Sequence, residues 1–228
     1  GNTHIKEPAW QTMNGTEMTF NQKKRGADYL LSASVNYRNE IDSTRTLSII
    51  ADYAQNHSNE TGVAATVPAV ATASEGKYHI GGTRLSYNSR RKWANVSMGL
   101  FFSTMNNKGN YAYNADVETY DTHESLYGAY LSLSRQFSSF YLQGGLRMEA
   151  DRRKLETGVS GTFTDSTEWK LFPNLVAKKQ LTAKSSVSLS VGQTIGRPSF
   201  SNLNPGLYYY DAISYKEGNP QLKPNVTT

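Results

Sequence analysis

The stretch that decides the fold reads Tyr29-Leu30-Leu31-Ser32-Ala33-Ser34-Val35-Asn36-Tyr37. Its odd positions hold Tyr, Leu, Ala, Val and Tyr, and its even positions are mostly polar. Because successive side chains of a β-strand point to opposite faces, this alternation predicts a strand with one apolar and one polar face.

The same two-residue period recurs along most of the chain. Three of the segments, 44–57, 93–106 and 139–152, run for about 12–14 residues, whereas strands of globular proteins average about 5–6 and a membrane-crossing strand needs about 9–11. Strands are expected at 13–20, 27–38, 44–57, 77–89, 93–106, 123–136, 139–152, 167–182, 185–197 and 207–217.

Short polar connectors alternate with longer irregular stretches between these segments. The short ones are expected near residues 38–43, 89–92, 136–139 and 182–185. The long ones, 59–76, 107–122 and 153–166, are predicted to be loops. Short turns on one side and longer loops on the other are typical of outer-membrane barrels, so the fold class predicted is all-β, with long antiparallel up-and-down strands that form part of a transmembrane β-barrel.

Composition and charge exclude several other classes of protein. The chain of 228 residues has 37% hydrophobic residues, 15 tyrosines and no cysteine, so neither a disulfide framework nor a thiolate metal site is expected. No apolar run approaches the roughly 20 residues of a membrane helix, and the first ten residues do not resemble a signal peptide. The net charge of +5 is mild, and its two basic runs, 23–25 and 90–92, are expected in turns, which argues against nucleic-acid binding.

No catalytic residue, metal ligand or cofactor is predicted. The histidines, His4, His57, His79 and His123, stand alone, without the spacing of a zinc site. The densest charged pattern places Arg147, Glu149, Asp151 and Arg153 on one face of a strand. Paired carboxylates occur in glycosidases, but charges of both signs along one strand favour a solvated, self-neutralising row that faces the barrel lumen.

The C-terminal third carries a more specific signal. It reads Ile195-Gly196-Arg197-Pro198-Ser199-Phe200, then Leu203-Asn204-Pro205, then Tyr208-Tyr209-Tyr210-Asp211, and finally Glu217-Gly218-Asn219-Pro220-Gln221-Leu222-Lys223-Pro224. This order resembles the outer-membrane β-barrel family related to TonB-dependent receptors of Gram-negative bacteria. The resemblance covers roughly residues 77–228 well and 20–60 more loosely.

The resemblance implies the location, function and partners of the chain. Residues 1–228 would be a single partial barrel domain, without the plug domain and the C-terminal strands of the family, in the outer membrane. The full-length protein would take up a nutrient such as an iron chelate, cobalamin or a glycan, and its partners would be membrane lipid, the TonB energy-coupling complex and that small-molecule or glycan ligand. We expect the isolated fragment to associate through its unpaired edge strands, to close into a smaller barrel or to fold over and bury its apolar face.

Two roles are predicted for the motif residues. Arg197, Pro198, Asn204, Pro205, Gly218, Asn219 and Pro220 would shape turns and strand ends, because proline donates no backbone hydrogen bond and glycine permits positive φ. Tyr208, Tyr209, Tyr210 and Arg197 would face the ligand. The alternative to a receptor is a soluble β-sandwich or barrel that binds carbohydrate or protein, and a soluble all-β enzyme is a weaker third possibility.

Aromatic residues near the expected strand ends bear on this choice. Tyr37, Tyr53, Tyr87, Trp93 and Trp169 lie where the aromatic girdles of a membrane barrel would fall. Ordinary hairpin ends place aromatic residues similarly, so both interpretations stay open.

Overall fold

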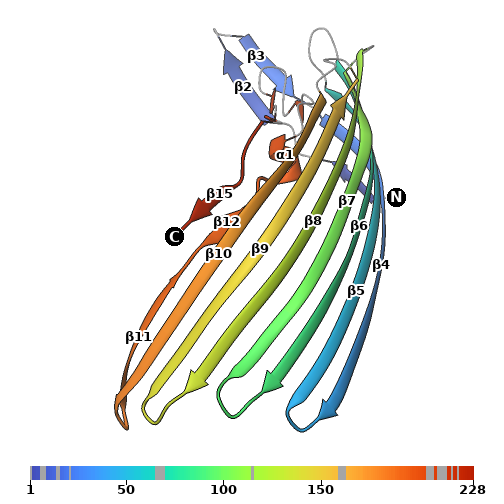
Figure 1. Ribbon diagram of the computed structural model, residues 1–228. Helices are drawn as coiled ribbons and strands as arrows, with labels where there is room; N and C mark the ends of the chain where they lie inside the picture. Colours follow the sequence, from blue (N-terminus) through green and yellow to red (C-terminus); the bar gives the residue numbers. More distant parts are fainter. Residues whose placement is uncertain are drawn as a thin grey trace.

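One curved antiparallel sheet of nine strands contains most of the chain (Figure 1). The computed structural model describes residues 2–5, 9–13, 16–20, 22–64, 70–113, 116–158, 163–203, 208–209, 215–216, 218–219 and 221–228. The strand order is β1-β4-β5-β6-β7-β8-β9-β10-β11, so from β4 onward each strand pairs with the next one in the sequence. The predicted all-β, up-and-down architecture is confirmed.

The strands of the large sheet are unusually long. They are β1 (Asn2–Ile5), β4 (Gln22–Asp42), β5 (Arg45–Ala64), β6 (Val70–Arg90), β7 (Asn95–Tyr113), β8 (Asp116–Gln136), β9 (Phe140–Thr157), β10 (Phe163–Thr182) and β11 (Ser185–Gly192). The remaining elements are β2 (Ala9–Met13), β3 (Thr16–Phe20), β12 (Thr194–Gly196), α1 (Phe200–Leu203), β13 (Tyr208–Tyr209), β14 (Tyr215–Lys216) and β15 (Asn225–Thr227). Among the residues placed by the structure, no helix has the length and apolar character needed to cross a bilayer.

The predicted long loops are wrong, because most of their residues belong to strands. β5 and β6 stay in register from Arg45 opposite Ser89 to Ala64 opposite Val70. The β7–β8 ladder likewise reaches Tyr113 opposite Asp116. Residues 106–110 are polar at both even and odd positions, and residues 70–74 are mostly small, so the backbone ladder continues although the alternation of large apolar and polar residues has stopped.

Other predicted boundaries also require correction. Instead of one strand at 13–20, β2 and β3 form a hairpin. The expected strand at 207–217 is replaced by the paired β13 and β14, and the one at 185–197 is divided into β11 and β12. Of the two basic runs expected in turns, 90–92 reaches a turn whereas 23–25 lies inside β4.

Short turns join the strands at one end of the sheet, which we call the turn end (Figure 1). The β4–β5 turn is held by Asp42, whose carboxylate accepts hydrogen bonds from the Thr44 hydroxyl at 2.7 Å and from Arg45 Nε at 2.6 Å. The Thr44 backbone N–H donates to the same carboxylate at 2.8 Å. The hydrogen bonds from Thr44 and Arg45 hold the pKa of Asp42 well below its usual range.

The end of β11 follows from a proline in the neighbouring strand. The ladder between β10 and β11 stops at Asn174 opposite Gly192. Beyond it, the carbonyl of Pro173 accepts a hydrogen bond from the Gln193 N–H at 3.2 Å. In a strand, the N–H and C=O groups of one residue point toward the same neighbouring strand. At Pro173 that neighbour is β11, so the missing N–H removes a hydrogen bond from the β10–β11 ladder where β11 ends. There the chain departs from the sheet, and β12 pairs with β15 instead.

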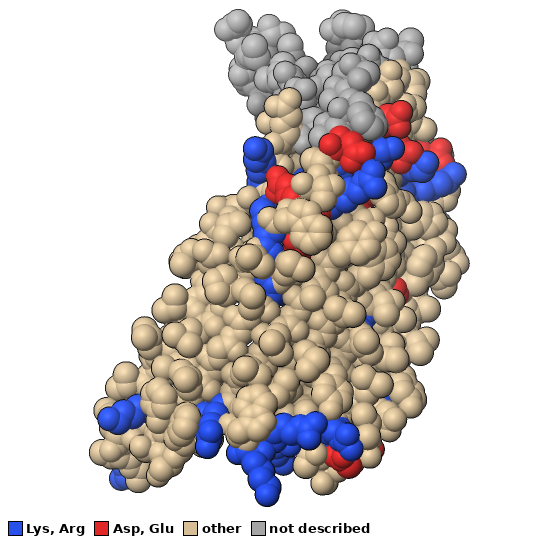
Figure 2. Space-filling model, in the orientation of Figure 1, with Lys and Arg blue, Asp and Glu red and all other residues tan. Residues whose placement is uncertain are grey.

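Large apolar side chains cover one face of the sheet, which we call the outer face. They come from alternate positions of the strands and include Leu31, Val35, Ile49, Leu85, Leu100, Leu133, Leu146, Leu175 and Leu189. Figure 2 shows a broad zone nearly free of charged side chains between the charged groups at the two ends of the molecule. On the outer face of β10 this zone runs from Trp169 to Ala177, close to the 9–11 residues of a membrane-crossing strand. The outer face therefore has the belt of a lipid-facing surface.

Aromatic side chains border this belt. Tyr37 and Trp93 are exposed toward the turn end, and Tyr53 and Trp169 are exposed at the opposite border. The rings of Phe102 and Tyr127 lie 4.9 Å apart at that border. Their placement at both edges of an exposed apolar surface favours the girdle interpretation over ordinary hairpin ends.

The opposite, inner face is lined partly by glycines that lie beneath aromatic rings. Gly99 of β7 is directly opposite Tyr130 of β8, and Phe101 is directly opposite Gly128. Each ring lies over the facing glycine, and the Tyr130 hydroxyl reaches across β7 to donate to Ser86 Oγ at 3.1 Å. Cross-strand pairs of glycine and an aromatic residue thus fix the register of β6, β7 and β8.

Replacing Gly99 by alanine is expected to lower the free energy of unfolding by about 1–3 kcal/mol. A Cβ there would overlap the backbone carbonyl oxygen of Leu85 and come within 2.6 Å of the Tyr130 ring. The matched control is Gly144→Ala in β9, where no atom lies within 4 Å of the added Cβ. Denaturant unfolding of both variants is the measurement, and equal effects would contradict the register argument.

Candidate functional site

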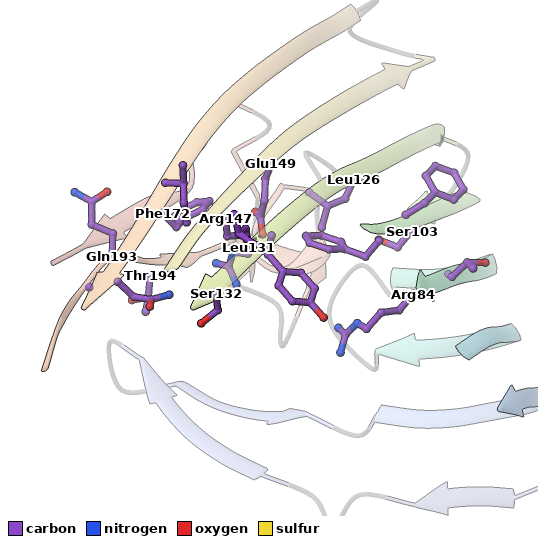
Figure 3. A pocket seen from close by; sticks show the side chains of 18 of the residues that line it. Arg84, Ser103, Leu126, Leu131, Ser132, Arg147, Glu149, Phe172, Gln193 and Thr194 are labelled. Atoms are coloured by element: carbon purple, nitrogen blue, oxygen red, sulfur yellow. Dashed lines mark ion pairs between the residues drawn. The ribbon is translucent and has the colours of Figure 1, made fainter. Parts of the chain in front are cut away.

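A cavity of about 1380 Å³ lies against the inner face of the sheet. Its wall is assembled from residues of several strands, among them Arg84, Ser132 and Arg147 (Figure 3), together with Asp52 and Asn174. Asp52 accepts a hydrogen bond from Ser34 Oγ at 2.6 Å. The guanidinium of Arg84 has no acidic partner in the described part of the chain. The inner face is therefore a surface of mixed polar, charged and aromatic groups on the side opposite the lipid-facing belt.

Six charged side chains form the most ordered part of this surface, and we call them the ion cluster. They are Glu124 of β8, Arg147, Glu149, Asp151 and Arg153 of β9, and Arg197, which follows β12. Three arginines thus face three carboxylates, so the cluster has no net charge. The prediction that the four β9 residues share one face is confirmed.

Arg197 joins two of these carboxylates. Its Nη2 lies 2.5 Å from Glu149 Oε2, and its Nε lies 3.2 Å from Asp151 Oδ2. On the other side, Arg147 Nε is 3.1 Å from Glu149 Oε1. Arg153 Nε is 3.4 Å from Glu124 Oε2. Every carboxylate of the cluster is therefore within ion-pair distance of an arginine.

Three of the six members of the ion cluster are buried, whereas a solvated row was predicted, and Arg147 and Arg197 are partly exposed. Glu149 retains 4% of its exposed surface, Asp151 7% and Arg153 9%. Phe172 of β10 is also buried, and the Arg147 guanidinium lies 4.7 Å from the centre of its ring. The prediction failed because it treated β9 alone. The row of charged residues on β9 is covered by side chains of neighbouring strands and by Arg197, which lies 46 residues beyond Asp151 in the sequence.

The other predicted site residues fall into two groups. The backbone of Tyr208 and Tyr209 forms β13, opposite Tyr215 and Lys216. Tyr210, Asn204, Pro205 and Pro220 lie outside the described residues. The ligand-facing role of these tyrosines and of Arg197 stays a prediction.

The motif residues around Asn219 form a turn. The Asn219 side-chain oxygen accepts from the Gln221 N–H at 2.9 Å, and its carbonyl accepts from the Leu222 N–H at 3.2 Å. The Asn219 N–H donates to the carbonyl of Asn202 in α1 at 2.7 Å. Gly218, just before this turn, is buried. Similarly, β12 ends at Gly196, immediately before the Arg197-Pro198 pair.

A metal centre has no support in this region. The described residues contain no group of three or more His, Asp or Glu side chains that could hold a metal ion. The arrangement offers paired charges and neutral polar groups.

Long antiparallel strands, an apolar belt with aromatic borders and a polar inner face together define a membrane-spanning β-sheet protein. Residues 12–228 match the model of the outer membrane protein beta-barrel family. The chain belongs to this family, and its location is the outer membrane of Gram-negative bacteria. A search of curated proteins found no match.

Solved structures of outer-membrane transporters share the fold. The ferric citrate transporter FecA in its unliganded form is 16% identical, with a TM-score of 0.61, and the match covers 77% of this chain and 28% of FecA. The ferric yersiniabactin uptake receptor FyuA from Yersinia pestis is 17% identical, with a TM-score of 0.53, over 78% of this chain and 29% of the receptor. The copper transporter OprC is 14% identical, with a TM-score of 0.53, over 90% of this chain and 35% of OprC. The chain thus spans about a third of the length of these proteins.

Proposed function

We propose that this chain forms part of the barrel wall of a TonB-dependent outer-membrane receptor, a transporter rather than an enzyme, that takes up a nutrient such as an iron chelate, cobalamin or a glycan. The observation that carries the proposal is the contrast between the two faces of one sheet. Apolar side chains cover the outer face, and a cavity with polar and paired charged groups lies against the inner face. A polar lumen behind a lipid-facing wall is what a solute needs in order to cross the membrane.

The sequence motif and the structural relatives support energised uptake in particular. Residues 197–224 resemble TonB-dependent receptors, and two of the solved structures with this fold are named as a ferric citrate transporter and a ferric yersiniabactin uptake receptor. We therefore expect the full-length protein to need the TonB complex. Its substrate class would be set by parts of the protein that face the ligand.

Uptake by the native bacterium tests this function. Deleting the gene is expected to abolish accumulation of one radiolabelled class, ferric chelate, cobalamin or oligosaccharide, and loss of TonB is expected to have the same effect. Uptake that continues without TonB would indicate a passive pore. Unchanged uptake of all three classes after deletion would contradict the proposed substrate range.

Two neighbouring residues of β8 provide a matched pair of variants for this assay. Ser132 lines the inner cavity, and Leu133 faces outward at the belt. Ser132→Trp places an indole in the path of the solute and is expected to reduce the rate of uptake. Leu133→Trp places the same group in lipid and is expected to leave the rate unchanged. Equal rates in the two variants would show that the solute does not pass along this face.

A further inference from the structure

The turn end of the sheet is strongly basic. Residues 38–46, 88–95, 134–140 and 178–187 contain nine Lys and Arg against two Asp and Glu, a net charge of +7. The rest of the chain contains 15 Lys and Arg against 17 Asp and Glu, so this end accounts for the whole net positive charge of the protein. Blue side chains accordingly cluster at the lower end of the molecule in Figure 2.

Most of these cations lack an acidic partner. The two acids of the turn end are already occupied, because Glu40 pairs with Arg38 at 3.3 Å and Asp42 with Arg45 at 2.5 Å. Seven exposed cations of the turn end form no ion pair with any residue that the structure describes. They are Arg90, Arg91, Lys92, Arg135, Lys178, Lys179 and Lys184. We call these seven residues the basic rim.

The opposite end of the belt differs, although it also contains lysine and arginine. There Lys108 lies 2.6 Å from Asp121, Arg152 lies 3.1 Å from Asp165, and Lys77 lies 3.3 Å from Glu75. Those cations are neutralised within the protein. An excess of positive charge that is available to a partner is therefore a property of the turn end.

Exposed apolar groups accompany the basic rim. Trp93 is 56% exposed in the turn that follows Arg91 and Lys92, and Phe137 is exposed beneath Arg135, whose guanidinium lies 4.9 Å from the ring centre. Leu181 is exposed close to Lys179. Arg135 directly follows the last outward leucine of β8 along the outer face, so cations and aromatic rings lie at the edge of the belt. Cations mixed with Trp and Phe at this depth are typical of a bilayer interface.

We propose that the basic rim binds the headgroups of anionic phospholipids in the leaflet that surrounds the turn end. Seven cations without internal counterions require external ones, and phosphodiester groups at the edge of the apolar belt are the anions nearest to them. Such binding would fix the depth and tilt of the strands in the bilayer. Assigning a lipid ligand to the basic rim rests on membership of the outer-membrane family and does not depend on the proposed uptake function.

Lipid retention by the full-length receptor tests the proposal. The protein is equilibrated with equal amounts of phosphatidylglycerol and phosphatidylcholine, excess lipid is diluted away, and the retained lipids are quantified by mass spectrometry. We expect phosphatidylglycerol to be enriched about fivefold over phosphatidylcholine. This is the preference that roughly one Lys or Arg near the headgroups would produce. High salt should remove the enrichment, because it screens exposed charges.

Two triple variants with equal loss of charge locate the interaction. Arg91→Gln, Arg135→Gln and Lys179→Gln together are expected to abolish the enrichment. Lys77→Gln, Lys108→Gln and Lys154→Gln, at the opposite end, are expected to preserve it. Equal retention of the two lipids by the wild type, or the same enrichment in both variants, would overturn the proposal. Binding to isolated peptidoglycan without lipid preference would also overturn it and would assign the basic rim to a cell-wall polymer.

Discussion

Replacing Arg197 by alanine is expected to lower the free energy of unfolding by about 3 kcal/mol, as the loss of one partner from a buried ion pair generally does. Arg197 contacts Glu149 at 2.5 Å and Asp151 at 3.2 Å, and both carboxylates are buried. Without it, three carboxylates would face two arginines in the ion cluster. The cost arises because these carboxylates cannot regain the water that they lost on folding.

Arg84→Ala is the matched control, because Arg84 lies on the same inner face and has no acidic partner among the described residues. Its effect should stay within about 0.5 kcal/mol. Denaturant unfolding in phospholipid vesicles measures both changes. Hydrogen exchange should also show faster exchange at 193–203 in the Arg197 variant only, since Arg197 holds this segment against β9. Equal exchange in the two variants would mean that Arg197 does not anchor it.

Replacing Leu100 by arginine should cost about 2–4 kcal/mol, the usual penalty for a cation near the middle of a lipid-facing strand. Leu100 is 57% exposed on the outer face, within the belt of β7. A cation at this position loses its hydration unless the bilayer thins locally. Unfolding of the variant in vesicles measures the penalty.

Val117→Arg separates membrane burial from simple surface exposure. Val117 is on the neighbouring strand β8 and is 54% exposed, but it lies near the start of that strand, ten residues before the aromatic border at Tyr127. Water reaches this part of the strand, so arginine there should change stability by less than about 1 kcal/mol. Similar penalties at the two positions would contradict the assigned position of the bilayer.

The sequence was sufficient to predict the strands only where one face meets lipid. At Tyr29–Tyr37 and along the equivalent parts of the other strands, the lipid requires apolar residues at every second position, so the period appears in the sequence itself. Near residues 106–110 polar residues occupy both even and odd positions, so the alternation of apolar and polar side chains is lost. The backbone ladder and cross-strand contacts, such as those of Lys108 with Asp121 and of Tyr111 with Tyr120, maintain the strand there. The hydropathy of the sequence shows no two-residue period at these positions.

The candidate site shows the same division. The alternation along β9 correctly placed Arg147, Glu149, Asp151 and Arg153 on one face. Their burial was not predictable, because Glu124 and Arg197 are brought to them by the pairing of β8 and β9 and by the path of the chain after β11. The charge-balanced cluster exists only when these three segments meet.

The sequence by itself thus determined the fold class, the lipid-facing side of each strand and, through the residues from Arg197 to Pro224, the family. These properties follow from local rules: the two-residue period of a strand, the chemistry of turns and an ordered motif. The tertiary structure decided the length of the strands beyond the belt, the pairing of the buried charges and the gathering of the basic rim at one end. Each of these depends on residues far apart in the chain, which only the antiparallel ladder brings side by side.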